Sequence, residues 1–507
     1  MLYTCLPEAL AVARRGDQCG SVKEINSKRL LALNLRKLGG GEFHFTPRSY
    51  VLVTDSLGHE FVDFVHDFKA SQAFAILKYV SNDQSGCAGL PCSTRVEPPN
   101  LQLPEGTFGR ELPDISWEPG PDPTRGVTTD MVRTSVAVAE RAIEVFHQGG
   151  RISSVVVTDE EWTVLHDFSP HASPNGLDVA AYAPQAVQLL AALPPECQVT
   201  LLEQNLWILK PSLNGGGNGR GIALVDRLPS SPSQLLSWAA AVGRGGGGGV
   251  NDALDGCLLQ KLVERPHLLD QLLLQDSAVS HTFQDVEQRW AVATQAVAED
   301  VPRVQPNPFA NVGGIGLFKY NLRLWILASM ASPPEVWLYR DSYVDLAATE
   351  FTADLNIASH VTNLQRGHRA CQRYWALPDF SAYLRRMHGG RDLYGEQILP
   401  QARAIICNVF RALQRPPNSL LNKPVARLKR LGVDVLVDAN HAVWLVEFNV
   451  LRNDYGLKAA KGQEAKDDLT RRLVEEETKL KAALESGNCI PPTWELVSDS
   501  MLHPVLD

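Results

Sequence analysis

The 507-residue sequence lacks the features that would direct it to a membrane or a secretory route. It contains no run of about 18 apolar residues, which excludes an ordinary transmembrane helix. The N-terminal residues, Met-Leu-Tyr-Thr-Cys-Leu-Pro-Glu, do not combine a basic segment with a following apolar one. We therefore expect neither a secretory signal nor a membrane partner.

An excess of basic charge and a cysteine framework are also missing. Lys and Arg number 48 against 57 Asp and Glu, a net charge of −9. Proteins that coat nucleic acid usually carry a basic excess, so we expect no nucleic-acid partner. The nine cysteines are odd in number and form no Cys-x-x-Cys pair. This disfavours a disulfide framework and a structural zinc site, and it favours a reducing compartment such as the cytoplasm.

The length and composition that remain are those of a folded chain with several units. Apolar residues make up 44% of the sequence and charged residues 21%, and the length suggests about three domains. We expect an N-terminal α/β domain over 1–80, a linker over 81–128, a central domain over 129–260, a C-terminal domain over 261–490 and a tail over 491–507.

Hydrophobic periodicity and turn residues predict the main elements of these units. The expected helices span residues 26–38, 131–147, 233–242, 400–414 and 466–485. The expected strands span residues 50–54, 153–158, 207–210, 221–225, 258–263, 318–328 and 335–339.

A glycine-rich segment follows the strand that ends at Lys210. It reads Lys-Pro-Ser-Leu-Asn-Gly-Gly-Gly-Asn-Gly-Arg-Gly and includes Gly217, Gly219, Arg220 and Gly221. The spacing matches neither a P-loop nor a dinucleotide fingerprint, and strands flank it on both sides. Glycines let backbone N–H groups approach phosphates, and a neighbouring cation neutralises their charge. The segment predicts either a lid over a triphosphate or a flexible hairpin loop, with equal weight.

A second pattern near the C-terminus predicts a hairpin with carboxylates on one face. Its strands end at Asp438 and begin at Val443, and pairing those two residues puts Asp434 opposite Glu447. Asp434, Glu447 and Asn449 then share a face with Leu436 and Leu445. The opposite, apolar face is expected to hold Val433, Val435, Val437, Trp444, Val446 and Phe448. Two carboxylates and an amide favour a Mg²⁺ site, and a solvated outer face is the alternative.

A third pattern places cations along one strand. Lys319, Asn321 and Arg323 alternate and point to the same face, and Arg340 comes from the next strand. These cations could hold phosphate and carboxylate oxygens. Taken alone, they are better interpreted as surface charge on a half-exposed sheet.

In this order the motifs resemble the tubulin tyrosine ligase-like family of ATP-grasp ligases. The matching segments begin at Trp207, Leu259, Lys319, Trp337, His360, Val433 and Trp444 and read WILKP, LQKLVERP, KYNLR, WLYRDSY, HVTN, VDVLV and WLVEFN. The resemblance covers residues 200–455 well and residues 27–54 more weakly. It implies an α+β ATP-grasp fold with the nucleotide between two antiparallel sheets, preceded by a small α/β N-terminal domain.

The resemblance also implies ATP and Mg²⁺ as cofactors and assigns roles to residues. Lys210 and the glycine segment would contact phosphates, and Gln260, Lys261 and Leu262 would line the adenine side. The γ-phosphate and the incoming carboxylate would be held by Lys319, Arg323 and Arg340, with Asn363 helping to position them. Asp434, Glu447 and Asn449 would bind Mg²⁺. Asn321 would lie at the nucleotide, where the family usually has aspartate.

The implied activity is the addition of a free amino acid to tubulin through an acyl phosphate, with the protein located at microtubules. Glutamate, glycine and tyrosine remain open as the amino acid. Residues 365–430 hold thirteen Lys or Arg and three Asp or Glu, which would attract an acidic tubulin tail; a solvated helical surface is the alternative. The alternative functions are a ligase for another protein and an inactive microtubule-binding scaffold.

Overall fold

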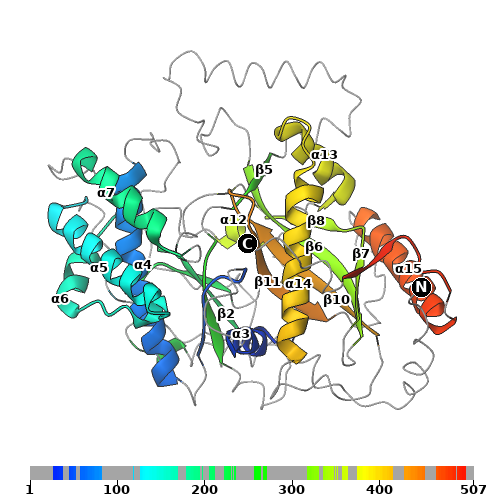
Figure 1. The fold of residues 1–507 in the computed structure, drawn as a ribbon, viewed down its shortest axis with the longest axis horizontal. Helices are drawn as coiled ribbons and strands as arrows, with labels where there is room; N and C mark the ends of the chain where they lie inside the picture. The colour runs from blue at the N-terminus through cyan, green and yellow to red at the C-terminus, as the bar shows by residue number, and fades with distance from the viewer. Residues whose placement is uncertain are drawn as a thin grey trace, which may run out of the picture.

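The computed structural model describes most of the expected elements. The described residues are 25–37, 45–52, 57–82, 118, 126–169, 179–197, 205–211, 222–235, 256–270, 317–329, 335–362, 374–414, 428–450 and 464–497, with gaps at 26, 195–196, 230, 232, 264–265, 348, 350, 352–356 and 487. They form two antiparallel sheets with helices packed on them (Figure 1). The predicted α+β class is confirmed.

The smaller sheet joins segments that lie far apart in the sequence. Its strands are β1 (Ser49–Leu52), β2 (Trp207–Pro211), β3 (Ala223–Val225) and β4 (Cys257–Lys261), in the order β1-β4-β2-β3. Ser49 of β1 pairs with Gln260 of β4. Segments that we expected in separate N-terminal and central units therefore share one sheet.

The larger, eight-stranded sheet is built around the long strand β6 (Leu317–Ser329). Strands β10 and β7 pair with β6 on its two sides, and β5 and β8 pair with it as well. The other strands are β5 (Leu268–Asp270), β7 (Val336–Tyr339), β8 (Tyr343–Leu346), β9 (Tyr374–Ala376), β10 (Leu428–Val437), β11 (Val443–Val450) and β12 (Trp494–Val497). Strand β12 pairs with β7, although residues 491–507 were expected to form a tail.

A layer of helices lies beside the smaller sheet, at the left of Figure 1. It contains α4 (Leu57–Asn82), α5 (Thr129–His147), α6 (Asp159–Leu165) and α7 (Val179–Ala192). The strand predicted over residues 153–158 is wrong: a 3₁₀ turn, η3 (Ile152–Ser154), precedes an extended segment without a strand partner. Val155 and Val157 are buried in this helical core, whereas Val156 between them is exposed. This alternation of buried and exposed residues is the same as in a strand, so the sequence pattern was misleading.

Helices cover both faces of the larger sheet, but they cover one face only in part. On one face, α13 (Leu377–Met387) and α14 (Leu399–Gln414), with the intervening π-helical turn η6 (Tyr394–Ile398), pack over Tyr320, Leu322 and Leu324 of β6. On the other face, α15 (Glu464–Ser486) packs over Trp325 and Leu327. The stretch of that second face with Lys319, Asn321 and Arg323 lies beyond α15 and borders the smaller sheet.

The β10–β11 hairpin has the predicted register at its site end and a different one at its turn. Asp434 lies opposite Glu447 as predicted, but Val437, not Asp438, pairs with Val443. A β-bulge after Asp434 offsets the two halves by one residue.

The bulge also changes which side chains face the core. Leu445 packs with Val433, Val435 and Phe448 in the main core, whereas Trp444 lies with Leu436 in a separate cluster. The predicted faces of Trp444, Val446 and Leu445 are therefore wrong: Val446 lines a cavity on the other side. The predicted faces of Asp434 and Glu447 are right.

The short helices α3 (Lys28–Lys37) and α12 (Ile357–His360) complete the described elements near the site. Helix α3 packs against α14 and β1, which brings the N-terminal segment against the larger sheet. None of the described helices combines the length and apolar character needed to cross a bilayer.

Candidate active site

A small cavity of about 80 Å³ lies between the two sheets. It brings together eight of the residues that the sequence analysis selected. From the smaller sheet and the chain after it come Lys210, Gln260, Lys261 and Leu262, and from the larger sheet come Lys319, Asn321, Asp434 and Glu447. Residues more than a hundred positions apart thus share one cavity.

Five selected residues lie outside the described part of the chain: Gly217, Gly219, Arg220, Gly221 and Asn363. Their described neighbours are at the cavity, because Ile222 and Thr362 both line it. The basic segment is described over residues 374–414 and 428–430. There, Arg385, Arg391, Arg403 and Arg430 pair with acidic side chains, so its charge is less available than the sequence count suggests.

Three lysines line the cavity and are almost completely buried. Lys261 and Lys319 are each 1% exposed. Lys210 Nζ donates to Gln260 Oε1 at 2.7 Å. Lys261 Nζ donates to the Leu206 carbonyl at 2.7 Å and lies 5.5 Å from the centre of the Trp207 ring.

Burial disfavours the charged form of these lysines. It lowers the pKa of Lys210 to about 8. Burial, together with the positive charge of Lys210, lowers the pKa of Lys319 to about 7. An anion in the cavity would restore the charged forms, so this wall is suited to phosphate oxygens.

The opposite wall carries two carboxylates joined by an amide. Asn449 Nδ2 donates to Asp434 Oδ2 at 2.9 Å and to Glu447 Oε1 at 3.0 Å. Arg323 holds Asp434 with two hydrogen bonds, one of them 2.7 Å from Nη2 to Oδ2. Lys28 Nζ lies 2.7 Å from Glu447 Oε2.

These contacts keep the Glu447 carboxylate charged. Burial by itself would raise the pKa of Glu447, but Lys28 and the Asn449 amide outweigh it and lower the pKa to about 2. The carboxylates of Asp434 and Glu447 offer the hard oxygen ligands that Mg²⁺ prefers, and the Asn449 oxygen would join them after its amide turns over, since Nδ2 faces both carboxylates here. The donor set at Asp434, Glu447 and Asn449 therefore fits the predicted cation.

Arg340 does not join the cluster. It follows β7, its side chain is 61% exposed, and its Nε lies 3.9 Å from the Glu495 carboxylate of β12. Arg323 lies at the site, where its guanidinium pairs with the Asp434 carboxylate, although it was expected to hold the γ-phosphate or the incoming carboxylate. Alternation thus placed Lys319 and Arg323 on the expected face of β6, whereas Arg340 lies at the β7–β12 edge of the sheet.

Sequence reasoning did not select Lys28, Thr362 or Asp345 as site residues. Lys28 opens α3 and reaches the site only because that helix packs against the larger sheet. The Thr362 hydroxyl donates to Asn321 Oδ1. Asp345 of β8 is buried and lies directly opposite Asn321 on the same face of the sheet. Only Thr362 lay within a quoted motif, His360-Val-Thr-Asn363.

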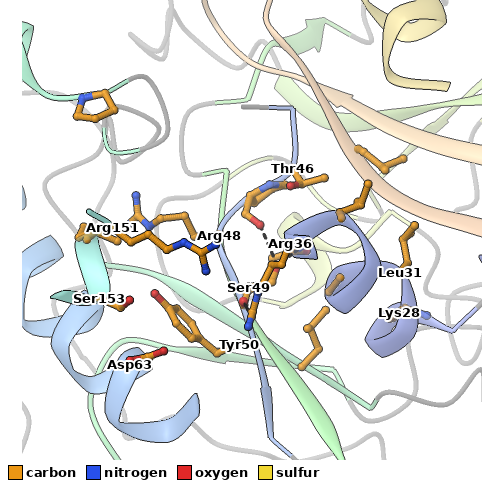
Figure 2. Close-up of a pocket in the computed structure, with 18 of the residues that line it drawn as sticks. Lys28, Leu31, Arg36, Thr46, Arg48, Ser49, Tyr50, Asp63, Arg151 and Ser153 are labelled. Carbon is orange, nitrogen blue, oxygen red and sulfur yellow. Dashed lines mark hydrogen bonds between the residues drawn. The ribbon is translucent and has the colours of Figure 1, made fainter. Parts of the chain in front are cut away.

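A larger cavity of about 520 Å³ adjoins the first and shares Lys28, Pro47, Gln260 and Val446 with it. Figure 2 shows Lys28 and Leu31 of α3 on one side and Arg151 and Ser153 on the other. Arg36 and Arg48 also line it, paired with Glu60 and Asp67. This cavity borders the carboxylate cluster, and its charged lining residues are Asp63, Arg151 and the paired Lys28, Arg36 and Arg48.

Comparisons of the sequence with known proteins point to one family. Residues 312–452, which include β6 through β11, match the sequence model of the tubulin-tyrosine ligase family. Protein monoglycylase TTLL8 of Mus musculus is 23% identical over 85% of this chain and 46% of its own length. Tubulin glycylase 3A of Drosophila melanogaster is 24% identical over 57% of this chain and 25% of its own length.

A further relative bears a different activity in its name. Probable tubulin polyglutamylase TTLL9 of Rattus norvegicus is 25% identical over 31% of this chain and 35% of its own length. The chain thus spans less than half of the length of each of these relatives. The match over residues 312–452, the named relatives and the order of the motifs all support the resemblance of this chain to the tubulin tyrosine ligase-like family.

Proposed function

We propose that this chain is an ATP- and Mg²⁺-dependent ligase that joins an amino acid to tubulin through an amide bond. One observation carries the proposal: buried Lys210, Lys261 and Lys319 and charged Asp434 and Glu447 line the same cavity between two antiparallel sheets. This lining suits phosphate groups and a cation, which is the arrangement that the ATP-grasp resemblance implies, and the cavity of about 80 Å³ would widen to admit the whole nucleotide.

In this proposal each wall has its own role. Lys210 and Lys319 hold phosphate oxygens, and the end of β4 with Gln260 and Lys261 borders the adenine. Asp434, Glu447 and Asn449 would hold Mg²⁺, which would supply neutralisation of the phosphate charge. Arg323 orients Asp434 by its paired hydrogen bonds.

The proposed reaction activates a carboxylate of the substrate protein. A carboxylate oxygen attacks the γ-phosphorus of ATP, the bond to the bridging oxygen breaks, and ADP leaves. The amine of the free amino acid then attacks the acyl phosphate. The amide bond forms, phosphate leaves with the carboxylate oxygen, and the former ammonium gives up two protons. Positioning and charge neutralisation supply the catalysis, so no nucleophilic side chain is needed.

Asn321 does not leave this site without a carboxylate. Asp345, directly opposite on β8, supplies a buried carboxylate at the neighbouring position. Asp345 does not itself line the cavity, so it favours the ligase over the inactive scaffold only by placing a negative charge beside Asn321.

Tubulin is the proposed substrate, and glycine is the first candidate for the added amino acid. The relatives support both, since two of those described are named as glycylases. An acidic tubulin tail would approach through the cavity of Figure 2, past Arg151 and Lys28. The protein would then act at microtubules in the cytoskeleton.

The test incubates the whole chain with tubulin, ATP and MgCl₂ and, in separate reactions, glycine, glutamate or tyrosine. Mass spectrometry of the tubulin tails is expected to show added glycine. Addition of glutamate or tyrosine alone would overturn the choice of glycine and keep the ligase. Addition to other proteins of an extract, with tubulin unmodified, would support the ligase with another substrate. No addition, together with co-sedimentation with microtubules, would establish the scaffold instead.

A further inference from the structure

Three histidines from distant parts of the chain meet on the opposite face of β6 from the nucleotide cavity. His267 precedes β5, His388 follows α13, and His441 lies in the turn between β10 and β11. One ligand nitrogen from each histidine lies within 4.8 Å of the others. Among the described residues, these histidines form the group of three or more histidine, cysteine or acidic side chains that are close enough to share a metal ion.

Backbone contacts fix the three residues independently of their rings. The His267 N–H donates to the Val437 carbonyl at 2.9 Å, and the His388 N–H donates to the Leu384 carbonyl at 3.0 Å. The His441 carbonyl accepts from Gln401 Nε2 at 2.9 Å. The rings therefore need only side-chain rotation to converge further.

His441 has an unusual backbone conformation. Its φ of 64° makes it the non-glycine residue with a positive φ among those described. Glycine or asparagine is favoured in this left-handed region, and a bulky residue there often indicates a functional requirement for its side chain. The turn thus holds an imidazole where a glycine would be less strained.

The surroundings favour the neutral imidazoles that metals require. Burial lowers the pKa of His267, and the two other histidines lower it further. Arg391 opposes protonation of His388 and His441, while Asp438 favours protonation of His441. The Asp438 carboxylate accepts hydrogen bonds from the Asn440 and Ala442 N–H groups and from Trp444 Nε1. These bonds stabilise the turn that carries His441.

We propose that His267, His388 and His441 bind one divalent transition-metal ion of the zinc class. Three imidazoles suit zinc, and a water molecule can complete a tetrahedron. Zn–N bonds of about 2.0–2.1 Å put ligand nitrogens about 3.3 Å apart, so each pair needs to close by at most about 1.5 Å. The Tyr320 hydroxyl, 3.1 Å from His267 Nδ1, orients that ring.

The ion would act as a structural clip. It would join the segment before β5 to the β10–β11 turn and to the end of α13, three segments that each border β6 or its neighbours. Tyr320 points to this side of β6, whereas Lys319 and Asn321 line the nucleotide cavity on the other. The proposal therefore stands apart from the proposed ligase activity.

A packed cluster of neutral rings is the competing explanation. The His388 and His441 rings are edge-to-face with centroids 4.9 Å apart, which is an ordinary aromatic contact. Such packing needs no metal, so metal content separates the two explanations.

The test uses the whole chain without a polyhistidine tag, dialysed against a chelator and then titrated with ZnCl₂. The variants are His388→Gln and His441→Asn, the latter because asparagine tolerates the left-handed backbone. The matched control is His147→Gln, which changes an exposed histidine on α5. We expect about one zinc per chain in the wild type and control, and at least about tenfold weaker binding in the two variants.

Binding of zinc with equal affinity in all four proteins, or no stoichiometric binding by the wild type, would overturn the proposal. If the variants do not fold, X-ray absorption spectroscopy of the zinc-loaded wild type provides the test, because it reports the number, type and distance of the zinc ligands. Three imidazoles at about 2.0 Å would support the site, and a first shell with fewer than three would contradict it.

Discussion

The two faces of β6 hold their polar groups in opposite ways. On the face proposed to bind the nucleotide, Arg323 pairs with Asp434 and Lys28 pairs with Glu447. On the other face, Tyr320 contacts a cluster of neutral imidazoles. On the charged face, each buried charge is stabilised by an opposite charge. On the histidine face, the proposed metal site depends on the positions of three imidazole rings. The two should therefore respond separately to substitution.

The largest expected effect is the loss of ligation in Glu447→Gln. Removing one charged ligand weakens the magnesium site and leaves Lys28 without its partner, so we expect the rate of amino-acid addition to fall by at least about 10³-fold. The matched control is Glu475→Gln, which changes an exposed glutamate of α15 and should retain activity. Mass spectrometry of modified tubulin measures both. Zinc content should be unchanged, and a fully active Glu447→Gln would refute the metal assignment.

The next effect is a difference in stability between variants of Arg323 and of Arg340. Arg323→Ala leaves the buried Asp434 carboxylate without its ion pair, and we expect a loss of about 3–5 kcal/mol in the free energy of unfolding. Arg340→Ala removes an exposed side chain and should change stability by less than about 0.5 kcal/mol. Urea unfolding of both variants provides the comparison. Equal losses would mean that Arg340 also has a buried role.

Proton uptake on ATP binding is a smaller effect with a defined sign. Burial depresses the pKa of Lys319 to about 7 and of Lys210 to about 8, below the 10.5 of an ordinary lysine. Anionic phosphates raise these values again, so ATP binding should take up protons near pH 8 and weaken as the pH rises further. The same depression makes the ligand-free protein more stable as the pH rises from about 7 towards 10.5.

Calorimetry of ATP binding in two buffers with different ionisation enthalpies measures the uptake. Lys319→Met should reduce the proton uptake. An identical binding enthalpy in both buffers would exclude the depressed lysines as phosphate ligands.

The smallest effect concerns the histidine face. Tyr320→Phe removes the hydroxyl that contacts His267, and we expect a loss of about 1 kcal/mol in stability. Zinc affinity should fall by about tenfold because a contact that orients the ligand is lost. ATP affinity should be unchanged, since Tyr320 points away from the nucleotide cavity. A parallel loss of ATP affinity would show that the two faces are coupled.

Strand alternation placed the residues of the cavity wall on one face, whereas their assignment to a nucleotide came from the family resemblance. Lys319, Asn321 and Arg323 alternate along β6, and Asp434 lies opposite Glu447 in a local hairpin. The bulge after Asp434 was not predicted, since nothing in the alternation of Val446 and Trp444 marks the extra residue. The pattern therefore placed the carboxylates correctly while misplacing the side chains nearer the turn.

The remaining residues depend on contacts between distant segments. Lys28 reaches Glu447 only through the packing of α3, and the histidines come from three segments separated by at least 53 positions (441 − 388 = 53). The hydrophobic periodicity within one helix or strand carries no information about tertiary contacts between distant segments. Arg340 illustrates the converse error: a suitable residue type near a motif does not ensure a position at the site.

The transfer of oxygen from a protein carboxylate to phosphate tests the central proposal most directly. A tubulin tail peptide whose glutamate carboxylates carry ¹⁸O at both oxygens is incubated with the whole chain, ATP, MgCl₂ and glycine. If the cavity between the sheets activates a carboxylate, each phosphate released with amide formation carries one ¹⁸O atom. Amide formation with unlabelled phosphate would contradict the account.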